Sequence, residues 1–417
     1  MHKKRVVITG IGVISPIGIG KNQYWQSLSE GKHGFKPITL FDTSDLKVKI
    51  GGEISNFNPK EILGSQNLMD LDRATLLLLC AAKIAFSDSG LEINESNTRH
   101  VGVSIGTTFG NLHSVSSFDR ESLREGPQYA NPSIFPSTVA NSPASRLNIR
   151  FGIKGLSSTI STGMCASLDA LDYAKDLISL DRVSTVVVGA VEDLSLQTFL
   201  GFYALNYLSG MDNDKPLSCP FDKRRDGIVL SEGAAVMIVE ELTTAVSRKA
   251  RIYAEVLGIG SCFDPARFYN YNPKGKGMTR AMRLALEDAN ISAKDVSCIF
   301  ANANSTKDAD LIETRAIKEV FDDESYNIPI TAIKSSIGEG YSVSGGFATI
   351  SGCLSLAEDL IPPTINYKEK DENCDLDYVI NQPRKKKLSH VMVNTFDPNG
   401  ANTTLIIGKF EDGHKSA

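Results

Sequence analysis

The sequence predicts an α/β fold in which strands and helices alternate and pack in layers. Short runs of β-branched and aliphatic residues recur along the 417-residue chain, and glycines or turn residues bound them, as is typical of buried strands. Stretches with apolar residues at helical spacing lie between these runs. Hydrophobic residues make up 41% and charged residues 22%, which is typical of a soluble globular protein. The length is sufficient for two packed halves.

The first predicted strand is "RVVITGIGVISP", residues 5–16, which opens the fold. Its glycines invite comparison with a dinucleotide-binding turn. However, Gly10, Gly12 and Gly18 do not form the G-x-G-x-x-G pattern, and Pro16 lies where the helix of such a site would begin. We therefore exclude a nucleotide site here.

The remaining elements follow in alternation. Further buried strands are predicted at 101–106, 184–191, 234–241, 252–260, 297–304 and 390–396. Helices are predicted at 69–90, 167–180 and 277–290. Residues 242–256 are the best candidate for the join between two interlocked halves, so we expect an N-terminal half at 1–245 and a C-terminal half at 246–417.

Charge and cysteine usage exclude several classes of function. A net charge of −5 argues against nucleic acid as the main partner, and the basic run at 384–387 is expected to be a surface loop. The seven cysteines form no CxxC pair, so we expect no metal site. No run approaches the ~18 apolar residues of a membrane span, and no secretory signal is evident. These features predict a cytoplasmic protein without a membrane partner.

The stretch "STGMCASLDAL", residues 161–171, is a strand-to-helix turn that could hold a nucleophile. Backbone N–H groups and the helix dipole at such a turn lower the pKa of a thiol, which supports Cys165 as a reactive residue. Cys165 could equally be a small, buried, apolar-like residue. The turn alone does not separate these two interpretations.

The histidine inventory is informative because a thiol nucleophile usually needs a histidine partner. None of the six histidines falls between residues 114 and 389, where most of the strand ends lie. A Cys–His enzyme is therefore poorly supported. His113 and His390 remain possible partners in space.

Several motifs resemble the β-ketoacyl-acyl carrier protein synthases, or ketosynthases, over nearly the whole chain. These motifs are "RVVITGIGVISPIG", "FDTSDLKVKIGGEISNFNP", "PSTVAN", "FDKRRDGIVLSEGAA", "IPPTIN" and "CDLDYV", in the order of that family. The resemblance implies a thiolase-like fold of five layers, αβαβα, built from two topologically similar halves. It also implies a dimer.

The same resemblance places the catalytic positions of the family. An ungapped match puts Met164 in the slot of the nucleophilic cysteine, and Cys165 one residue beyond it. Successive helical residues are ~100° apart, so we expect the two side chains to point in different directions. The two catalytic histidines of the family correspond to Asn304 and Glu339. Asn304 cannot carry a proton, and an ionised Glu339 could only accept hydrogen bonds.

Other family positions are retained or replaced. Lys334 and Glu313 match the family and are expected to be remnants of its polar network. The glycine-rich gating loop of the family, Gly-Phe-Gly-Gly, is here the sequence Asp-Pro-Asn-Gly at 397–400.

Replacement of all three reacting groups predicts a subunit without condensing activity. The branch that fits is the chain length factor, or ketosynthase β subunit, of type II polyketide systems, although its usual replacement is Gln rather than Met164. That resemblance implies an active ketosynthase α subunit as partner. It implies no cofactor of the chain's own, because an acyl carrier protein brings the phosphopantetheine. Two alternatives remain: a malonyl-carrier-protein decarboxylase, or a divergent β-ketoacyl synthase acting through Cys165.

Four apolar residues lie in segments that resemble those flanking the acyl tunnel and dimer interface of the family. They are Leu112, Ile134, Phe135 and Phe202. Ordinary core packing would explain each of them equally well.

Overall fold

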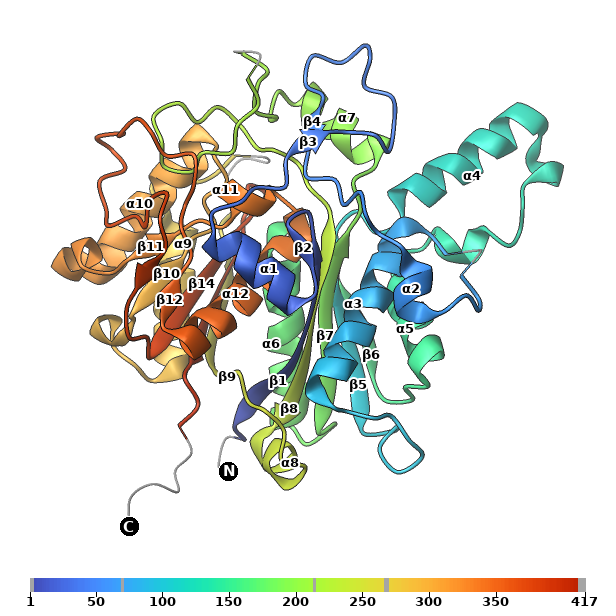
Figure 1. The fold of residues 1–417 in the computed structure, drawn as a ribbon, viewed down its shortest axis with the longest axis horizontal. Helices are drawn as coiled ribbons and strands as arrows, with labels where there is room; N and C mark the ends of the chain where they lie inside the picture. The colour runs from blue at the N-terminus through green and yellow to red at the C-terminus, as the bar shows by residue number, and fades with distance from the viewer. Residues whose placement is uncertain (1–3, 69–70, 213–214, 266–269, 412–417) are drawn as a thin grey trace.

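The computed structural model describes residues 4–68, 71–212, 215–265 and 270–411, and shows one large mixed sheet with helices on both faces (Figure 1). The sheet has 11 strands, and its continuous path runs β11-β10-β14-β15-β9-β1-β8-β7-β5-β6. β2 pairs with β1 outside this path. The path divides into two halves at the contact between β9 and β1.

The N-terminal half of the sheet has the order β1-β8-β7-β5-β6. Its first two pairings are antiparallel and its last two are parallel. The strands are β1 (Val6–Ser15), β8 (Gly233–Glu241), β7 (Thr185–Glu192), β5 (Val101–Gly106) and β6 (Ser157–Ile160). β1, β5 and β7 are buried along their whole length, as predicted from their content of β-branched and aliphatic residues.

The C-terminal half repeats this arrangement with the order β9-β15-β14-β10-β11. Again the first two pairings are antiparallel and the last two parallel. The strands are β9 (Ala254–Phe263), β15 (Ala401–Gly408), β14 (His390–Phe396), β10 (Cys298–Phe300) and β11 (Ile330–Thr331). The matching order and direction confirm two topologically similar halves. β1 and β9 join them through the pairs Val7–Glu255 and Ile8–Ala254.

The two halves of the sheet form two layers, and helices form the other three. α3 (Arg73–Ser89) and α5 (Ser142–Phe151) cover the N-terminal half, while α9 (Lys276–Ala289) and α10 (Lys307–Phe321) cover the C-terminal half. α6 (Ala166–Ser179) and α12 (Ser344–Glu358) lie between the two halves of the sheet and touch each other. The layers therefore follow the order αβαβα. The close approach of the central helices needs Gly345, because a Cβ there would lie 2.5 Å from Ser167 Oγ.

The other α-helices and strands lie outside these layers or at their edges. They are β2 (Gly18–Ile19), β3 (Lys36–Pro37), β4 (Ile50–Gly51), β12 (Leu360–Ile361), β13 (Arg384–Lys385), α1 (Lys21–Ser29), α2 (Pro59–Leu63), α4 (Leu112–Glu125), α7 (Leu196–Ala204), α8 (Leu242–Ser247) and α11 (Lys334–Ile337). Among these, α4 projects from the edge of the molecule (Figure 1).

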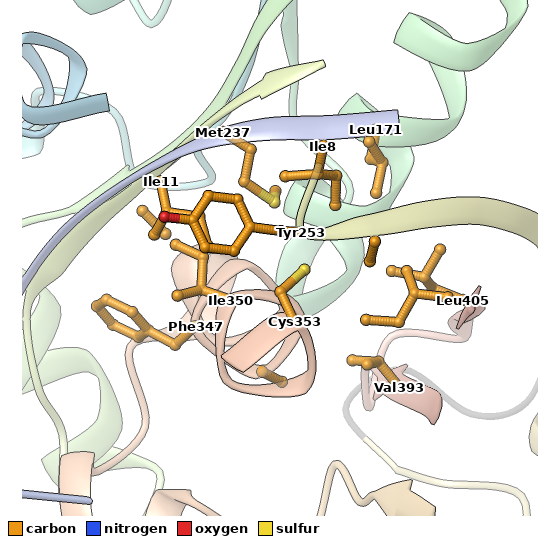
Figure 2. Packing of buried hydrophobic residues seen from close by; sticks show 14 of the residues in the cluster. Ile8, Ile11, Leu171, Met237, Tyr253, Phe347, Ile350, Cys353, Val393 and Leu405 are labelled. Atoms are coloured by element: carbon orange, nitrogen blue, oxygen red, sulfur yellow. The ribbon is translucent and has the colours of Figure 1, made fainter. Parts of the chain in front are cut away.

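The main core crosses the boundary between the halves. Figure 2 shows Ile8 and Met237 from the N-terminal strands above Phe347 and Cys353 of α12, with Leu405 of β15 to the right of Cys353. All five side chains are at most 1% exposed. Because α12 is buried on every side, neither half has a complete core without the other.

Several elements differ from the sequence-based expectation. The strand predicted at 297–304 is paired only at Cys298–Phe300, and the rest is a loop that lies in the site described below. The basic run is no simple loop, because Arg384–Lys385 form β13 against β12. The helix expected at 69–90 begins at Arg73, where the Asp72 side chain accepts a hydrogen bond from Thr75 N and caps it. Residues 69 and 70 lie outside the described residues.

Residues 242–256, expected to join the halves, contain α8 and the first residues of β9. Among the described helices, none has the length and apolar character required to cross a bilayer.

Candidate active site

The turn at the start of α6 buries Met164 and Cys165 in different surroundings. Both belong to a 3₁₀ turn, η3 (Gly163–Cys165), and both are 0% exposed. Met164 packs in an apolar cluster with Phe202 and Tyr341. Cys165 Sγ instead donates a hydrogen bond to the carbonyl oxygen of Thr395, at 3.2 Å. The two side chains therefore diverge, in agreement with the helical geometry expected from the sequence.

The surroundings of Cys165 disfavour a thiolate. Burial raises the pKa of its thiol well above the ordinary value, and the nearby carboxylates of Asp169 and Asp397 raise it further. The two candidate histidine partners lie elsewhere in the described structure. His113 lines a separate cavity with Arg73 and Arg120, and the His390 ring hydrogen-bonds to the carbonyl of Asp295.

The Asp397 carboxylate accepts hydrogen bonds from two backbone amides, one in the turn before α6 and one in its own loop. Met164 N donates to Asp397 Oδ2 at 2.8 Å, and Asn399 N donates to Oδ1 at 2.7 Å. A Cβ on Gly163, whose φ is +65°, would lie 2.0 Å from Oδ2, so only glycine fits there. Burial raises the pKa of Asp397, and these hydrogen bonds oppose the shift. The Asp397 carboxylate thus accepts the backbone N–H of Met164, a donor that a reacting carbonyl at this turn would otherwise use.

Glu339 is held by a buried ion pair and three further donors. Lys334 Nζ lies 2.9 Å from Glu339 Oε2, and the two side chains are only 6% and 1% exposed. The Oε1 atom accepts from Tyr341 N at 2.9 Å and from Ser344 Oγ at 2.7 Å. Asn304 Nδ2 donates to Oε2 at 3.4 Å. Both carboxylate oxygens of Glu339 therefore have hydrogen-bond donors, and Lys334 is paired with one of them.

Asn304 is engaged through its side chain and its backbone. Its Oδ1 accepts from the hydroxyl of Thr306 at 2.8 Å and from Thr306 N at 3.2 Å. Its backbone N–H donates to Asp310 Oδ1 at 2.9 Å. The structure therefore brings Asn304, Lys334 and Glu339 into one group in which Asn304 and Lys334 both donate hydrogen bonds to Glu339.

Glu313 on α10 supports the loop that carries Asn304. Its carboxylate accepts from Asn302 N at 2.9 Å, Ala303 N at 2.8 Å and Asn394 Nδ2 at 3.0 Å. Burial raises the pKa of Glu313 to about 7. Lys334 Nζ also donates to Asn302 Oδ1 at 3.0 Å, so Glu313 and Lys334 both hold this loop.

Two buried acids beside the site were missed by sequence reasoning. Glu192 accepts hydrogen bonds from Phe109 N at 3.2 Å and Ser342 Oγ at 2.6 Å, and burial raises its pKa to about 7. Burial raises the pKa of Asp193 to about 8, with the Glu192 charge as the next cause. Among the described residues, Asp193 Oδ1 has no hydrogen-bond partner. Glu192 is the last residue of β7 and Asp193 follows it. In the sequence they resemble an ordinary pair of surface acids, so their burial could not be predicted.

A cavity of about 340 Å³ lies next to the Met164 turn. Leu112 and Phe202, two of the four tunnel candidates, line it. Phe135 is 59% exposed in a 3₁₀ turn, η2 (Phe135–Ser137), and its ring centroid lies 6.1 Å from that of Phe118. Ile134, which precedes this turn, is half-buried. Leu112 and Phe202 thus share one cavity, whereas Ile134 and Phe135 lie on the projecting segment.

The described parts of the chain contain no candidate metal centre. No group of three or more His, Cys, Asp or Glu side chains there is arranged to hold a metal ion. All seven cysteines are free, and six of them are buried.

Two family models match the chain. One, described as "Beta-ketoacyl synthase, N-terminal domain", matches residues 3–245. The other, described as "Beta-ketoacyl synthase, C-terminal domain", matches residues 253–368.

Curated relatives and solved structures agree with these models. The chain is 36% identical to 3-oxoacyl-(acyl-carrier-protein) synthase 2 of Coxiella burnetii over 99% of this chain and 100% of that one. It is 37% identical to the protein of the same name from Synechocystis sp., over 99% of each. The ishigamide ketosynthase/chain length factor has a TM-score of 0.92 at 31% identity, covering 98% of this chain and 100% of that one. A type II PKS ketosynthase solved with its acyl-carrier protein has a TM-score of 0.89 at 28% identity and the same coverage.

Proposed function

The chain belongs to the β-ketoacyl synthase family, and from this we propose that it is a non-catalytic subunit of the chain length factor type. In this role it pairs with an active ketosynthase, and its cavity forms part of the tunnel into which the growing acyl chain extends. The structural likeness to the ishigamide ketosynthase/chain length factor supports this assignment.

One observation carries the proposal: the polar groups around the nucleophile position are already bound to one another. Met164 offers a thioether in place of a thiol, and the Asp397 carboxylate accepts its backbone N–H. At the histidine positions, Glu339 accepts hydrogen bonds from both Lys334 and Asn304. In this arrangement a thioester carbonyl or an enolate would have to compete with the carboxylates of Asp397 and Glu339 for the donors on which acyl transfer depends.

The same arrangement argues against the two catalytic alternatives. Decarboxylation of a malonyl unit develops negative charge on an enolate oxygen, and an ionised Glu339 would repel that charge. Condensation through Cys165 requires a thiolate, and its thiol is buried with a strongly raised pKa. Relatives named as 3-oxoacyl-(acyl-carrier-protein) synthases give the strongest support for a condensing activity, so the proposal must be tested against it.

Exposed features at one side of the molecule support a paired state. β6 ends the sheet path and pairs only with β5 among the described strands, which leaves a free edge. The segment from α4 to η2 exposes Leu123 at 86%, Tyr129 at 65% and Phe135 at 59%. Large apolar side chains at this exposure are typical of a surface that is covered in an assembly.

The acyl chain would arrive on an acyl carrier protein. A structural neighbour was solved in complex with such a carrier protein, and the chain covers the full length of that neighbour. The phosphopantetheine that carries the acyl group belongs to the carrier protein, so the proposed role needs no cofactor bound by this chain.

The test is to purify the chain alone and after co-expression with an intact ketosynthase from the same genome. Each preparation is incubated with malonyl-loaded carrier protein and an acyl primer, and carbon dioxide release and elongated products are measured by mass spectrometry. The proposal expects a one-to-one complex, with elongation by the complex only. Elongation or decarboxylation by the isolated chain at the rate of the complex would contradict it.

A further inference from the structure

Asp193 is a buried acid in electronegative surroundings. It follows the last residue of β7 and is 7% exposed, and its Oδ1 atom has no hydrogen-bond partner among the described residues. Burial raises its pKa to about 8, and the charges of Glu192 and Glu232 contribute to the rise, as does Asp72. Arg73 opposes the shift without cancelling it. A positive charge would therefore be attracted to this carboxyl group.

Asp193 lines a cavity of about 290 Å³, called here the Asp193 cavity. Its lining comes from α4, from the start of α7 and from the loop that carries Leu40 and Phe41. The volume far exceeds the ~10–15 Å³ that one water molecule requires. Gln197 also lines it, and the carboxamide oxygen of Gln197 has no hydrogen-bond partner in the described parts of the chain. The cavity thus contains two acceptor groups and an apolar wall.

Three basic side chains share this lining but do not neutralise Asp193. Arg73 is engaged with Glu232, to which its Nε and Nη2 atoms each donate at 2.6 Å. His113 and Arg120 are exposed on α4, so water and salt screen their charges.

The polar groups of the cavity favour a cation over an anion. An anion could accept from Arg120 and from the Gln197 N–H groups, but it would then share the cavity with Asp193, beside Glu192. A lysine ammonium or an arginine guanidinium has donors only, and it matches the carboxyl group of Asp193 and the carboxamide oxygen of Gln197.

The Asp193 cavity adjoins the surface that we assign to the paired subunit. α4 supplies His113 and Arg120 to the cavity, and the same helix, which projects from the molecule in Figure 1, exposes Leu123 at 86%. A subunit that covers α4 would therefore also lie at the cavity.

We propose that the paired ketosynthase subunit inserts a lysine or arginine side chain into the Asp193 cavity, where it pairs with Asp193 and donates to the Gln197 carboxamide oxygen. The aliphatic part of either side chain would pack against Leu40 and Phe41. An acid without a partner destabilises the isolated chain, and the cation removes this penalty in the complex only. This inference rests on the proposed function and adds the chemistry of one contact to it.

One substitution should therefore have opposite effects on the isolated chain and on the complex. Asp193→Asn removes the buried acid, so we expect the isolated chain to become more stable at pH 8. The same change removes the partner of the inserted cation, and we expect the Kd of the complex to rise by about 10-fold or more. Because the variant chain is the more stable one, misfolding cannot explain weaker association.

The affinity should also depend on pH through Asp193. The free chain holds the Asp193 proton below a pKa of about 8, whereas a paired cation favours the ionised form. Association then releases a proton, so affinity rises as the pH increases toward 8. We expect the wild-type Kd to fall by about 10-fold or more from pH 6 to pH 8. Glu192, whose pKa burial raises to about 7, also titrates in this window, so the contribution of Asp193 is the difference between wild type and Asp193→Asn.

The experiment uses the complex co-purified with the ketosynthase from the same genome. Sedimentation velocity over a dilution series gives the Kd at pH 6, 7 and 8 for wild type, Asp193→Asn and the exposed α4 control Asp119→Asn. Denaturant unfolding of the three isolated chains at pH 8 gives their stabilities. The control is expected to match wild type in both measurements.

Equal Kd values and equal pH dependence for wild type and Asp193→Asn would overturn the inference and leave the proposed function intact. Self-association of the isolated chain that is lost in Asp193→Asn would assign the cavity to a second copy and also overturn it. So would stabilisation of the isolated wild-type chain by ethylammonium chloride over sodium chloride, with no change in Kd, since the occupant would then be a small amine. Elongation by the isolated chain, without any complex, would instead refute the proposed function.

Discussion

The backbone amide of Met164 donates a hydrogen bond of 2.8 Å to the carboxylate of Asp397, a residue 233 positions away in the sequence. The contact links the start of α6 to the loop between β14 and β15. If position 164 is the nucleophile position, as the proposed function holds, this contact places a carboxyl group on an amide that could otherwise stabilise an oxyanion. Restoring a thiol at position 164 would therefore leave this anion in place.

Met164→Cys alone is expected to give no measurable acyl transfer. The new thiol would lie beside the Asp397 carboxylate, which raises a thiol pKa and repels the oxyanion. Met164→Cys with Asp397→Gly removes that charge, and we expect acylation of the introduced thiol to be at least 10-fold faster. Intact-mass spectrometry after incubation with an acyl-loaded carrier protein measures this, in a Cys165→Ala background. Equal acylation of the single and double variants would show that Asp397 does not block the site.

Cys165→Ala is expected to leave product formation by the complex nearly unchanged. The thiol is fully buried and donates only to the Thr395 carbonyl, so its loss leaves a small cavity and lowers the free energy of unfolding by about 1 kcal/mol. Product yield and thermal stability of the assembled complex measure both effects. A loss of activity in a complex that still assembles would favour the Cys165 mechanism.

Asp193→Asn is expected to stabilise the protein at pH 8 but not at pH 4. The folded-state pKa of Asp193 is about 8, and an unfolded Asp titrates near ~3.9. Between these values the folded protein binds the additional proton, so stability falls as pH rises through this window. Asparagine has no such proton, and we expect a gain of roughly 1–3 kcal/mol at pH 8. Denaturant unfolding at both pH values measures it, with the exposed Asp119→Asn as control.

Leu112→Ala is expected to lengthen the product of the complex or broaden its distribution, and Leu112→Trp to shorten it. Leu112 lines the cavity beside Met164, and overfilling a packed pocket costs ~1–3 kcal/mol. A difference of ~1.4 kcal/mol changes a product ratio about 10-fold. Product lengths from complexes of verified stoichiometry measure this. An unchanged length with slower turnover for both variants would exclude control by Leu112.

Phe135→Ala is expected to weaken assembly with the partner rather than alter product length. Its ring is 59% exposed beside Phe118 and does not line the cavity. Aromatic side chains at interfaces often contribute more than ~1 kcal/mol to binding. Size-exclusion chromatography of the complex at decreasing concentration measures the effect. A changed product length from an intact complex would indicate instead that Phe135 lines the acyl tunnel.

The sequence predicted most of the fold because buried strands have a strong local signal. Residues 5–16 and 101–106 are rich in β-branched and aliphatic residues, and both form strands close to the expected bounds. The strand expected at 297–304 was too long because its last residues hydrogen-bond to side chains of α10 instead of a neighbouring strand. The pattern of apolar residues does not show whether a backbone N–H bonds to a neighbouring strand or to a side chain.

The candidate site was predictable in part. The match to family motifs placed Met164, Asn304 and Glu339, and the structure groups the last two around Lys334. The contact between Asp397 and Met164 was not predictable, because it depends on the folding of two distant segments against each other. The burial of Asp193 depends on the packing around the end of β7 and was missed for the same reason.

The free edge of β6 also bears on how the cell must make this protein. The strand is the short segment Ser157–Ile160, with no proline and no charged residue to prevent pairing with a foreign strand. If the chain pairs with a ketosynthase as proposed, molecules produced in excess of that partner would expose this edge together with the apolar side chains of the α4 segment. Balanced synthesis, such as translation of both subunits from one transcript, would keep the concentration of unpaired chains low and protect the cell from their aggregation.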